Sequence, residues 1–139
     1  MNMKKSFLLT LATVVFSLFF LDGCSFLSGP GEKVKDLEFT VVSEENLSEE
    51  LKTILEERKE NPFKVTFNDK EYLYICIGYG KQATGGYSIA VDDLYLTEDA
   101  IRVSTSLLGP GPEDEAGSSA SFPYIVLKTE HLDIPVVFE

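Results

Sequence analysis

The second half of the chain is patterned for β-structure, and this feature limits the fold more than any other. In "FKVTF", residues 63–67, apolar and polar side chains alternate, as they do in a strand with one buried face. The next run, "EYLYICIG" (71–78), is almost continuously apolar, which indicates a central strand covered on both faces. The polar stretch "NDK" between them is typical of a tight turn. We therefore expect an antiparallel strand pair here, with Cys76 buried.

More strands are expected further along the chain. The run "YSIAVDDLYL" (87–96) keeps its apolar residues on one parity up to Val91 and on the other parity from Leu94 onward. Because a slip of one residue moves side chains to the opposite face of a sheet, this change predicts a bulge at Asp92 and Asp93. Three further strands are predicted in "IRVSTSL", "FPYIVLK" and "IPVVF", at residues 101–107, 122–128 and 134–138.

One helix is clear in the pattern. In "SEENLSEELKTILEERKEN" (43–61) the apolar residues form one stripe, acidic residues crowd the start and basic residues lie near the end. We expect the helix to be capped at Asn46 or Leu47 and to stop at Asn61, before a proline. The shorter run "LEFTVV" (37–42) predicts a first strand ahead of it.

Together these elements predict one α+β domain over residues 37–139. Its one amphipathic helix would pack on a mainly antiparallel, twisted sheet, or on a partly closed barrel, of six or seven strands. A chain of this length can support one domain with a modest core.

The first 23 residues have the pattern of a targeting signal. Lys4 and Lys5 precede an apolar stretch at residues 7–21. This stretch has the length of a secretory signal, about 7–15 residues, and is shorter than the roughly 20 residues of a membrane-spanning helix. We therefore expect residues 1–23 to direct export.

The segment ends in "LDGC" (21–24), which resembles the bacterial lipobox, although Asp22 departs from its usual small residue. The resemblance implies a lipoprotein signal peptide cleaved before Cys24 and lipid, including palmitate, on that cysteine. An ordinary signal peptide or an uncleaved anchor is the alternative. Residues 24–36, rich in Ser, Gly, Pro and charge, predict a flexible tether. We expect a protein anchored at the extracytoplasmic face of a bacterial cell membrane.

Composition argues against several classes of function. A net charge of −11 disfavours nucleic acid, which needs a basic footprint, and disfavours direct binding to anionic lipid. With Cys24 lipidated, Cys76 is left without a disulfide partner, and His131 is predicted in a distant turn. The acidic loop 113–115 lacks the alternating ligands of a calcium loop. We expect no enzyme, no metal and no cofactor.

A glycine-rich stretch, "GYGKQATGGYSI" (78–89), raises the question of nucleotide binding. A P-loop needs Lys and Ser/Thr directly after its last glycine, and here Gly86 and Tyr87 occupy those positions. The dinucleotide pattern also fails, because Ala83 replaces its third glycine. The loop connects two predicted strands, whereas phosphate loops connect a strand to a helix. We expect no bound nucleotide. The stretch is a strand corner with positive φ at Gly85, Gly86 or both, or an exposed recognition surface.

Three segments in order, "GKQATGGYSI", "LLGPGPED" and "SFPYIVLK", resemble the PrcB C-terminal domain family, the protease complex subunit PrcB family. The resemblance covers roughly residues 70–138, and its strongest residues are Thr84, Gly85, Gly86, Tyr87, Gly109, Pro110, Pro123 and Tyr124. It implies an accessory or interaction domain without catalytic residues, which assists or assembles with a surface protein such as a protease. The candidate protein-binding residues are therefore Lys81, Thr84, Gly85, Gly86, Tyr87, Pro110, Pro123 and Tyr124.

A second resemblance concerns the layout of the loops. Residues 81–87, 109–115 and 122–124 follow the order of the three binding loops of chagasin-type inhibitors of cysteine proteases. Here Gln82 and Ala83 replace an Asn-Pro pair, and the Arg and Trp of the third loop are absent. This resemblance would imply a protease inhibitor that acts through the same loops.

Overall fold

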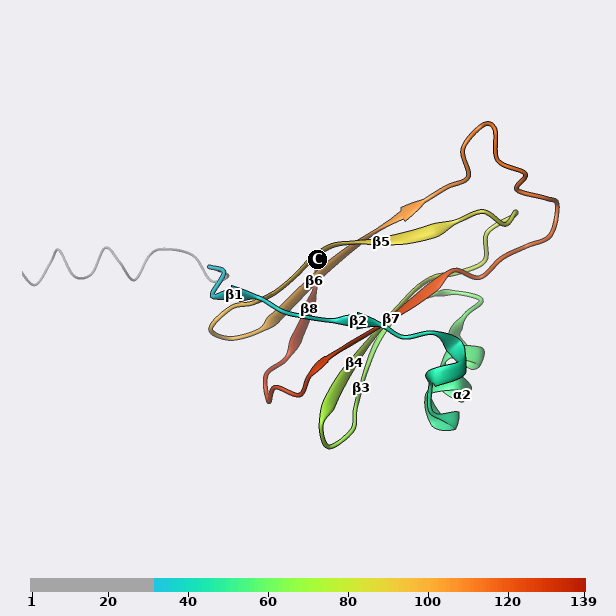
Figure 1. The fold of residues 1–139 in the computed structure, drawn as a ribbon. Coiled ribbons are helices and arrows are strands. Elements are labelled where there is room, and N and C mark those ends of the chain that lie inside the picture. The colour runs from blue at the N-terminus through green and yellow to red at the C-terminus, as the bar shows by residue number, and fades with distance from the viewer. Residues whose placement is uncertain (1–31) are drawn as a thin grey trace, which may run out of the picture. The chain divides into compact units, whose positions relative to one another are not determined.

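The computed structural model describes residues 32–139, which form two four-stranded sheets and an α-helix (Figure 1). The first sheet has the order β1 (Lys35–Asp36), β5 (Ser88–Leu96), β6 (Ile101–Leu108) and β8 (Val136–Phe138). The second has the order β2 (Thr40–Val41), β7 (Tyr124–Glu130), β4 (Tyr72–Tyr79) and β3 (Pro62–Asn68). Neighbouring strands are antiparallel, except that β8 runs parallel to β6.

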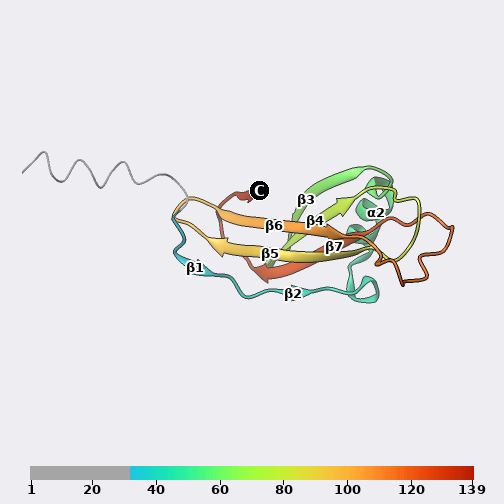
Figure 2. The ribbon, with the colours of Figure 1, turned by 90° about the horizontal axis from the view of Figure 1, so that it is seen from above.

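The predicted fold class, α+β with one sheet or partly closed barrel of six or seven strands, was wrong. The described chain is mostly β, in two separate sheets with no closed barrel, and it carries one short α-helix. Figure 2 shows the β5–β6 hairpin stacked on the second sheet. Side-chain alternation predicts strands and their buried faces, but it does not say whether the next hairpin pairs beside a strand or packs across from it.

The N-terminal part of the described chain passes from one sheet to the other. Of the predicted strand at 37–42, only β2 forms. The end of the predicted tether is not flexible, because Lys35 and Asp36 form β1 and pair with β5, in the other sheet. Between β1 and β2, Leu37 turns inward and is buried, and its N–H donates to the Leu94 carbonyl at 3.1 Å. This crossing closes one side of the sandwich. The predicted signal segment, Cys24 and most of the predicted tether lie outside the described residues.

Strand β4 lies at the centre of the second sheet and is covered on both faces, as its apolar run predicted. Leu73, Ile75 and Ile77 point into the core between the sheets, where the exposed fraction of Ile75 is 0%. Cys76 points the other way, into a second apolar cluster beneath the helix. Burial of one such aliphatic side chain contributes about 1.5–3 kcal/mol, so β4 contributes heavily to stability.

Helix α2 (Glu49–Arg58) covers the outer face of the second sheet (Figure 1). Leu51 and Leu55 are buried there in the cluster that contains Cys76. The predicted cap at Asn46 or Leu47 was wrong. A short 3₁₀ helix, η2 (Glu44–Asn46), occupies that stretch, and Ser48 caps α2 by accepting from the Leu51 N–H at 3.2 Å.

The predicted bulge in β5 is confirmed. The register with β6 shifts between Val91 and Asp93. Because of this shift, Ile89 before it and Leu96 after it both pack against the core between the sheets. In the described part of the chain, no helix is long and apolar enough to cross a membrane.

Candidate protein-binding site

Two long loops meet at one end of the sandwich and are hydrogen-bonded to each other. They are residues 80–87, between β4 and β5, and residues 109–123, between β6 and β7, and we call them together the loop platform. Gln82 and Ser121 exchange backbone hydrogen bonds of 2.8 and 3.0 Å. The Ser121 hydroxyl also donates to the Thr84 carbonyl at 2.6 Å. The two loops therefore present one joined surface.

Gly86 has the positive φ, +83°, that the sequence predicted for one of the paired glycines. Gly85 does not have it. Its N–H instead donates to the Ala116 carbonyl at 3.0 Å, which adds another link between the loops. A Cβ on Gly86 would lie 2.9 Å from the Pro110 Cβ, so the close approach of the loops also requires a glycine there.

The sequence did not single out Gly80, which also has a positive φ, +75°. A Cβ on Gly80 would lie 2.9 Å from the Pro62 backbone nitrogen. A glycine directly after a strand often has a positive φ, and this position could have identified Gly80. Next to it, the Lys81 N–H donates to the Glu60 carbonyl at 3.1 Å and holds the platform to the segment after α2.

The predicted binding residues differ in how accessible they are. Lys81 and Gly86 are exposed on the platform. Thr84, Tyr87 and Pro110 are half-buried, because the two loops cover them. Lys81 is thus the most accessible side chain among the candidates, and the hydrogen bond from its N–H to Glu60 holds its backbone in place.

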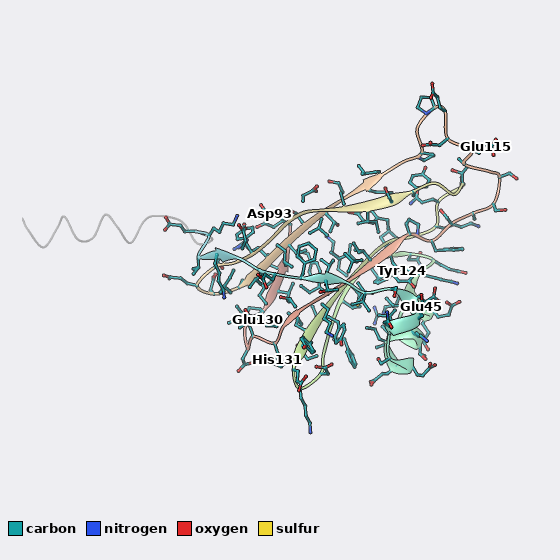
Figure 3. The ribbon with its side chains drawn as sticks, viewed as in Figure 1. Glu45, Asp93, Glu115, Tyr124, Glu130 and His131 are labelled. Carbon is teal, nitrogen blue, oxygen red and sulfur yellow. The ribbon has the colours of Figure 1, made fainter. Side chains whose placement is uncertain are left out.

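The structure separates Tyr124 from the platform. This residue opens β7 and packs against the apolar cluster under α2. Figure 3 labels it near the helix. It lines a hollow of about 260 Å³ together with Glu44, Glu56 and Lys59. Burial, and then the nearby carboxylates of Glu44 and Glu56, raise the pKa of Tyr124. Pro123 lies between the two regions, and its carbonyl accepts from the Tyr79 N–H at 3.0 Å.

Two sequence candidates for chemistry lie apart from this surface. Cys76 is 0% exposed, and burial raises the pKa of its thiol to about 12, which keeps it protonated at neutral pH. The predicted buried cysteine is confirmed. His131 is exposed after β7, with Nδ1 3.1 Å from the Asp69 carbonyl (Figure 3).

The acidic loop 113–115 forms a local turn at the outer end of the platform, where Figure 3 labels Glu115. Asp114 accepts from the Gly111 N–H at 2.6 Å. Over residues 32–139, no group of three His, Cys, Asp or Glu side chains is placed to hold a metal ion.

Sequence reasoning missed an apolar cleft of about 320 Å³ that opens between the two sheets, away from the β1–β2 crossing. Its lining combines β3, β4, β6 and β8, and no local pattern brings these strands together. Across it, the Tyr79 hydroxyl and Thr105 Oγ1 form a hydrogen bond of 2.6 Å that joins the sheets. The lining residues are Pro62, Phe63, Lys64, Ile77, Gly78, Tyr79, Val103, Thr105, Phe138 and Glu139.

Comparison with known proteins identifies the segment that contains the platform. No curated protein and no solved structure matches the chain significantly. The family model described as PrcB C-terminal matches residues 73–130, which run from β4 to the end of β7 and include both platform loops. Residues 73–130 therefore match the PrcB C-terminal family, the family that the motif Thr84–Tyr87 predicted.

Proposed function

We propose that this protein is a lipid-anchored, extracytoplasmic accessory module that binds a protein partner and has no chemistry of its own. Its family suggests a domain associated with a protease complex. The observation that carries the proposal is the loop platform, in which the two loops of the matched segment are joined by the Gln82–Ser121 pair.

A joined platform suits binding for a physical reason. Association costs less entropy when the contacting loops are already held in place. The backbone bonds at Gln82 and Ser121, and the bond from Gly85 to Ala116, hold the platform in the free protein. Lys81 stands exposed on it, in a chain whose net charge is −11, and offers a partner carboxylate a cationic contact.

The anchor is supported by residues 1–24 alone. Lipid on Cys24 would hold the chain at the membrane. Residues 24–32, which precede the stretch bonded to β5, would reach at most about 30 Å when extended. Mass spectrometry of the mature protein checks this part: we expect a diacylated or triacylated Cys24 at the N-terminus. An unmodified N-terminus beyond Cys24 would refute it.

Site-specific crosslinking tests the platform. A photoreactive amino acid replaces Lys81 in one variant and, as a matched control, Lys70 in the exposed β3–β4 turn in another. In cells, we expect a discrete crosslinked protein from position 81 and not from position 70. Mass spectrometry of the product identifies the partner. The proposal fails if position 81 gives no product, or the same products as position 70.

Protease inhibition is the second candidate, and one observation favours it: loops 81–87 and 109–115 lie together at one end of the sandwich. Loop 122–124 leads instead toward α2. Titration of the purified protein against surface and secreted proteases separates the two functions. An inhibitor lowers the rate of peptide hydrolysis at stoichiometric amounts, whereas an accessory module binds the protease and leaves that rate unchanged.

A further inference from the structure

Half of strand β6 has a free edge. On one side β6 pairs with β5 along its length, but on the other side β8 reaches only residues 101–103. There the Ile101 N–H donates to the Pro135 carbonyl and the Val103 carbonyl accepts from Glu139, each at 2.9 Å. The backbone N–H and C=O groups of a strand point to alternate sides from one residue to the next. Those of Thr105 and Leu107 therefore point to the same side as those of Ile101 and Val103, but beyond the end of β8.

The free edge borders the apolar cleft described above. Figure 2 shows the C-terminal end of the chain stopping partway along β6, with β3 beyond it. Thr105 lines the cleft from β6, and Phe63 and Phe138 line it from β3 and β8. A strand laid along Thr105 and Leu107 would direct alternate side chains into this space.

This edge also lacks the features that protect the edge of β3 and the open half of β5. Strand β3 carries Pro62 and Lys64, and the open half of β5 carries Asp92 and a bulge. Residues 103–108, "VSTSLL", contain no charge and no proline. Charged side chains, prolines and bulges are the usual means by which proteins block pairing at a sheet edge. Their absence beside an apolar cleft favours an edge that is kept open for pairing.

We propose that the free edge of β6 binds an extended peptide segment of a partner protein. The segment continues the line of β8, runs parallel to β6, exchanges backbone hydrogen bonds with Thr105 and Leu107, and places an apolar side chain in the cleft. The loop after β6 carries the acidic residues 113–115, and the chain has a net charge of −11. Basic residues therefore follow the apolar one in the bound segment. This surface runs along β6 and meets the loop platform only at residues 113–115, away from Lys81 and the Gln82–Ser121 pair. It goes beyond the proposed function.

Selection from random peptides displayed on phage tests the proposal, with the full chain in mild detergent as the target. We expect the selected peptides to share an apolar residue followed by Lys or Arg. Leu107→Pro removes one edge N–H and should weaken their binding about fivefold or more. Leu107→Ala keeps the N–H and is the matched control, which should retain most of the binding.

Amide hydrogen exchange of the unaltered protein gives an independent measurement if Leu107→Pro fails to fold. A bound peptide should protect the amides of Thr105 and Leu107. Protection along β3 or β5 instead would overturn the proposal, as would a library without binders or binding that Leu107→Pro leaves unchanged. A dimer that Leu107→Pro dissociates would overturn it in favour of a second copy of this chain.

The platform variant Lys81→Ala separates this proposal from the proposed function. We expect it to leave peptide binding unchanged. If Lys81→Ala abolishes peptide binding and Leu107→Pro does not, the platform binds the peptide, and the edge proposal is wrong while the proposed function stands. If the crosslinking at position 81 fails and the β6 edge still binds peptides, the platform proposal is wrong and the edge proposal stands.

Discussion

The two sheets of this protein are covered to different extents. The second sheet has the first sheet on one face and α2 on the other, so consecutive residues of β4 that point to opposite faces, such as Ile75 and Cys76, are both fully buried. The β5–β6 ribbon of the first sheet ends without neighbours, and Leu108 at its tip is 51% exposed. The difference matches the division of roles proposed above, in which the covered sheet supplies stability and the uncovered ends carry the two proposed binding surfaces.

The largest effect is expected when alanine substitutions at Ile75 and Leu108 are compared for their cost in stability. Ile75→Ala should lower the free energy of unfolding by about 2–5 kcal/mol, because it opens a cavity in the core between the sheets. Leu108→Ala, the control, should change it by no more than about 0.5 kcal/mol. Urea denaturation measures both values. Equal losses would show that the ribbon tip is part of the stabilising core.

A test within the platform compares two glycines with positive φ. Gly86→Ala should cost about 1–3 kcal/mol, because an alanine resists this backbone conformation and its Cβ would approach Pro110 at 2.9 Å. Gly117→Ala meets the same backbone resistance, but nothing lies within 4 Å of its Cβ, so it should cost less. Thermal unfolding measures the difference. An equal cost would mean that the contact between the loops adds nothing.

The burial of Cys76 on β4 also predicts that the stability of the folded protein depends on pH in the alkaline range. Burial raises the pKa of Cys76 from 9.0 to about 12 in the folded protein, whereas the thiol of the unfolded chain ionises near the lower value. The unfolded state therefore releases its proton first as the pH rises. Stability should fall by about 1.4 kcal/mol per pH unit between about pH 9 and pH 12 through this group alone.

Cys76→Ala is the control for that slope. It removes the thiol at a cost of about 1–2 kcal/mol at neutral pH, as a small large-to-small change in the core. Its stability should then decline less steeply than that of the unaltered protein in the same alkaline range. Parallel curves, or rapid thiol labelling of the native protein, would contradict the burial of Cys76.

The smallest expected effect concerns the link between the sheets. Tyr79→Phe removes the hydroxyl that bonds Thr105 across the cleft and should cost about 0.5–1.5 kcal/mol. If the uncovered half of β6 is held mainly by this bond, hydrogen exchange at residues 104–108 should rise in the variant while exchange at β4 stays unchanged. Faster exchange in both sheets would mean that the two regions open together.

Much of the local structure could be predicted from the sequence. The two-sided burial of β4, the bulge before Asp93 and the positive φ of Gly86 all follow from apolar parity or from glycine's freedom at positive φ. The helix was predicted, but its cap was misplaced from Ser48, because several polar residues in a row can each serve as a cap. Of the predicted site, the motif residues at 84–87 do lie on one surface with Pro110, whereas Tyr124 lies under α2.

By itself, the sequence determined which segments after α2 become strands, which side chains of β4 and β5 turn inward, and which family model residues 73–130 match. These depend on neighbours along the chain, because side-chain direction alternates with every residue of a strand. Only the tertiary structure decided that the chain crosses between two sheets at Leu37, that the platform loops join through Gln82 and Ser121, and that β6 outruns β8 beside an apolar cleft. Those features depend on which strands become neighbours, and pairing over long sequence separations is set by the packing of the whole domain rather than by any local pattern.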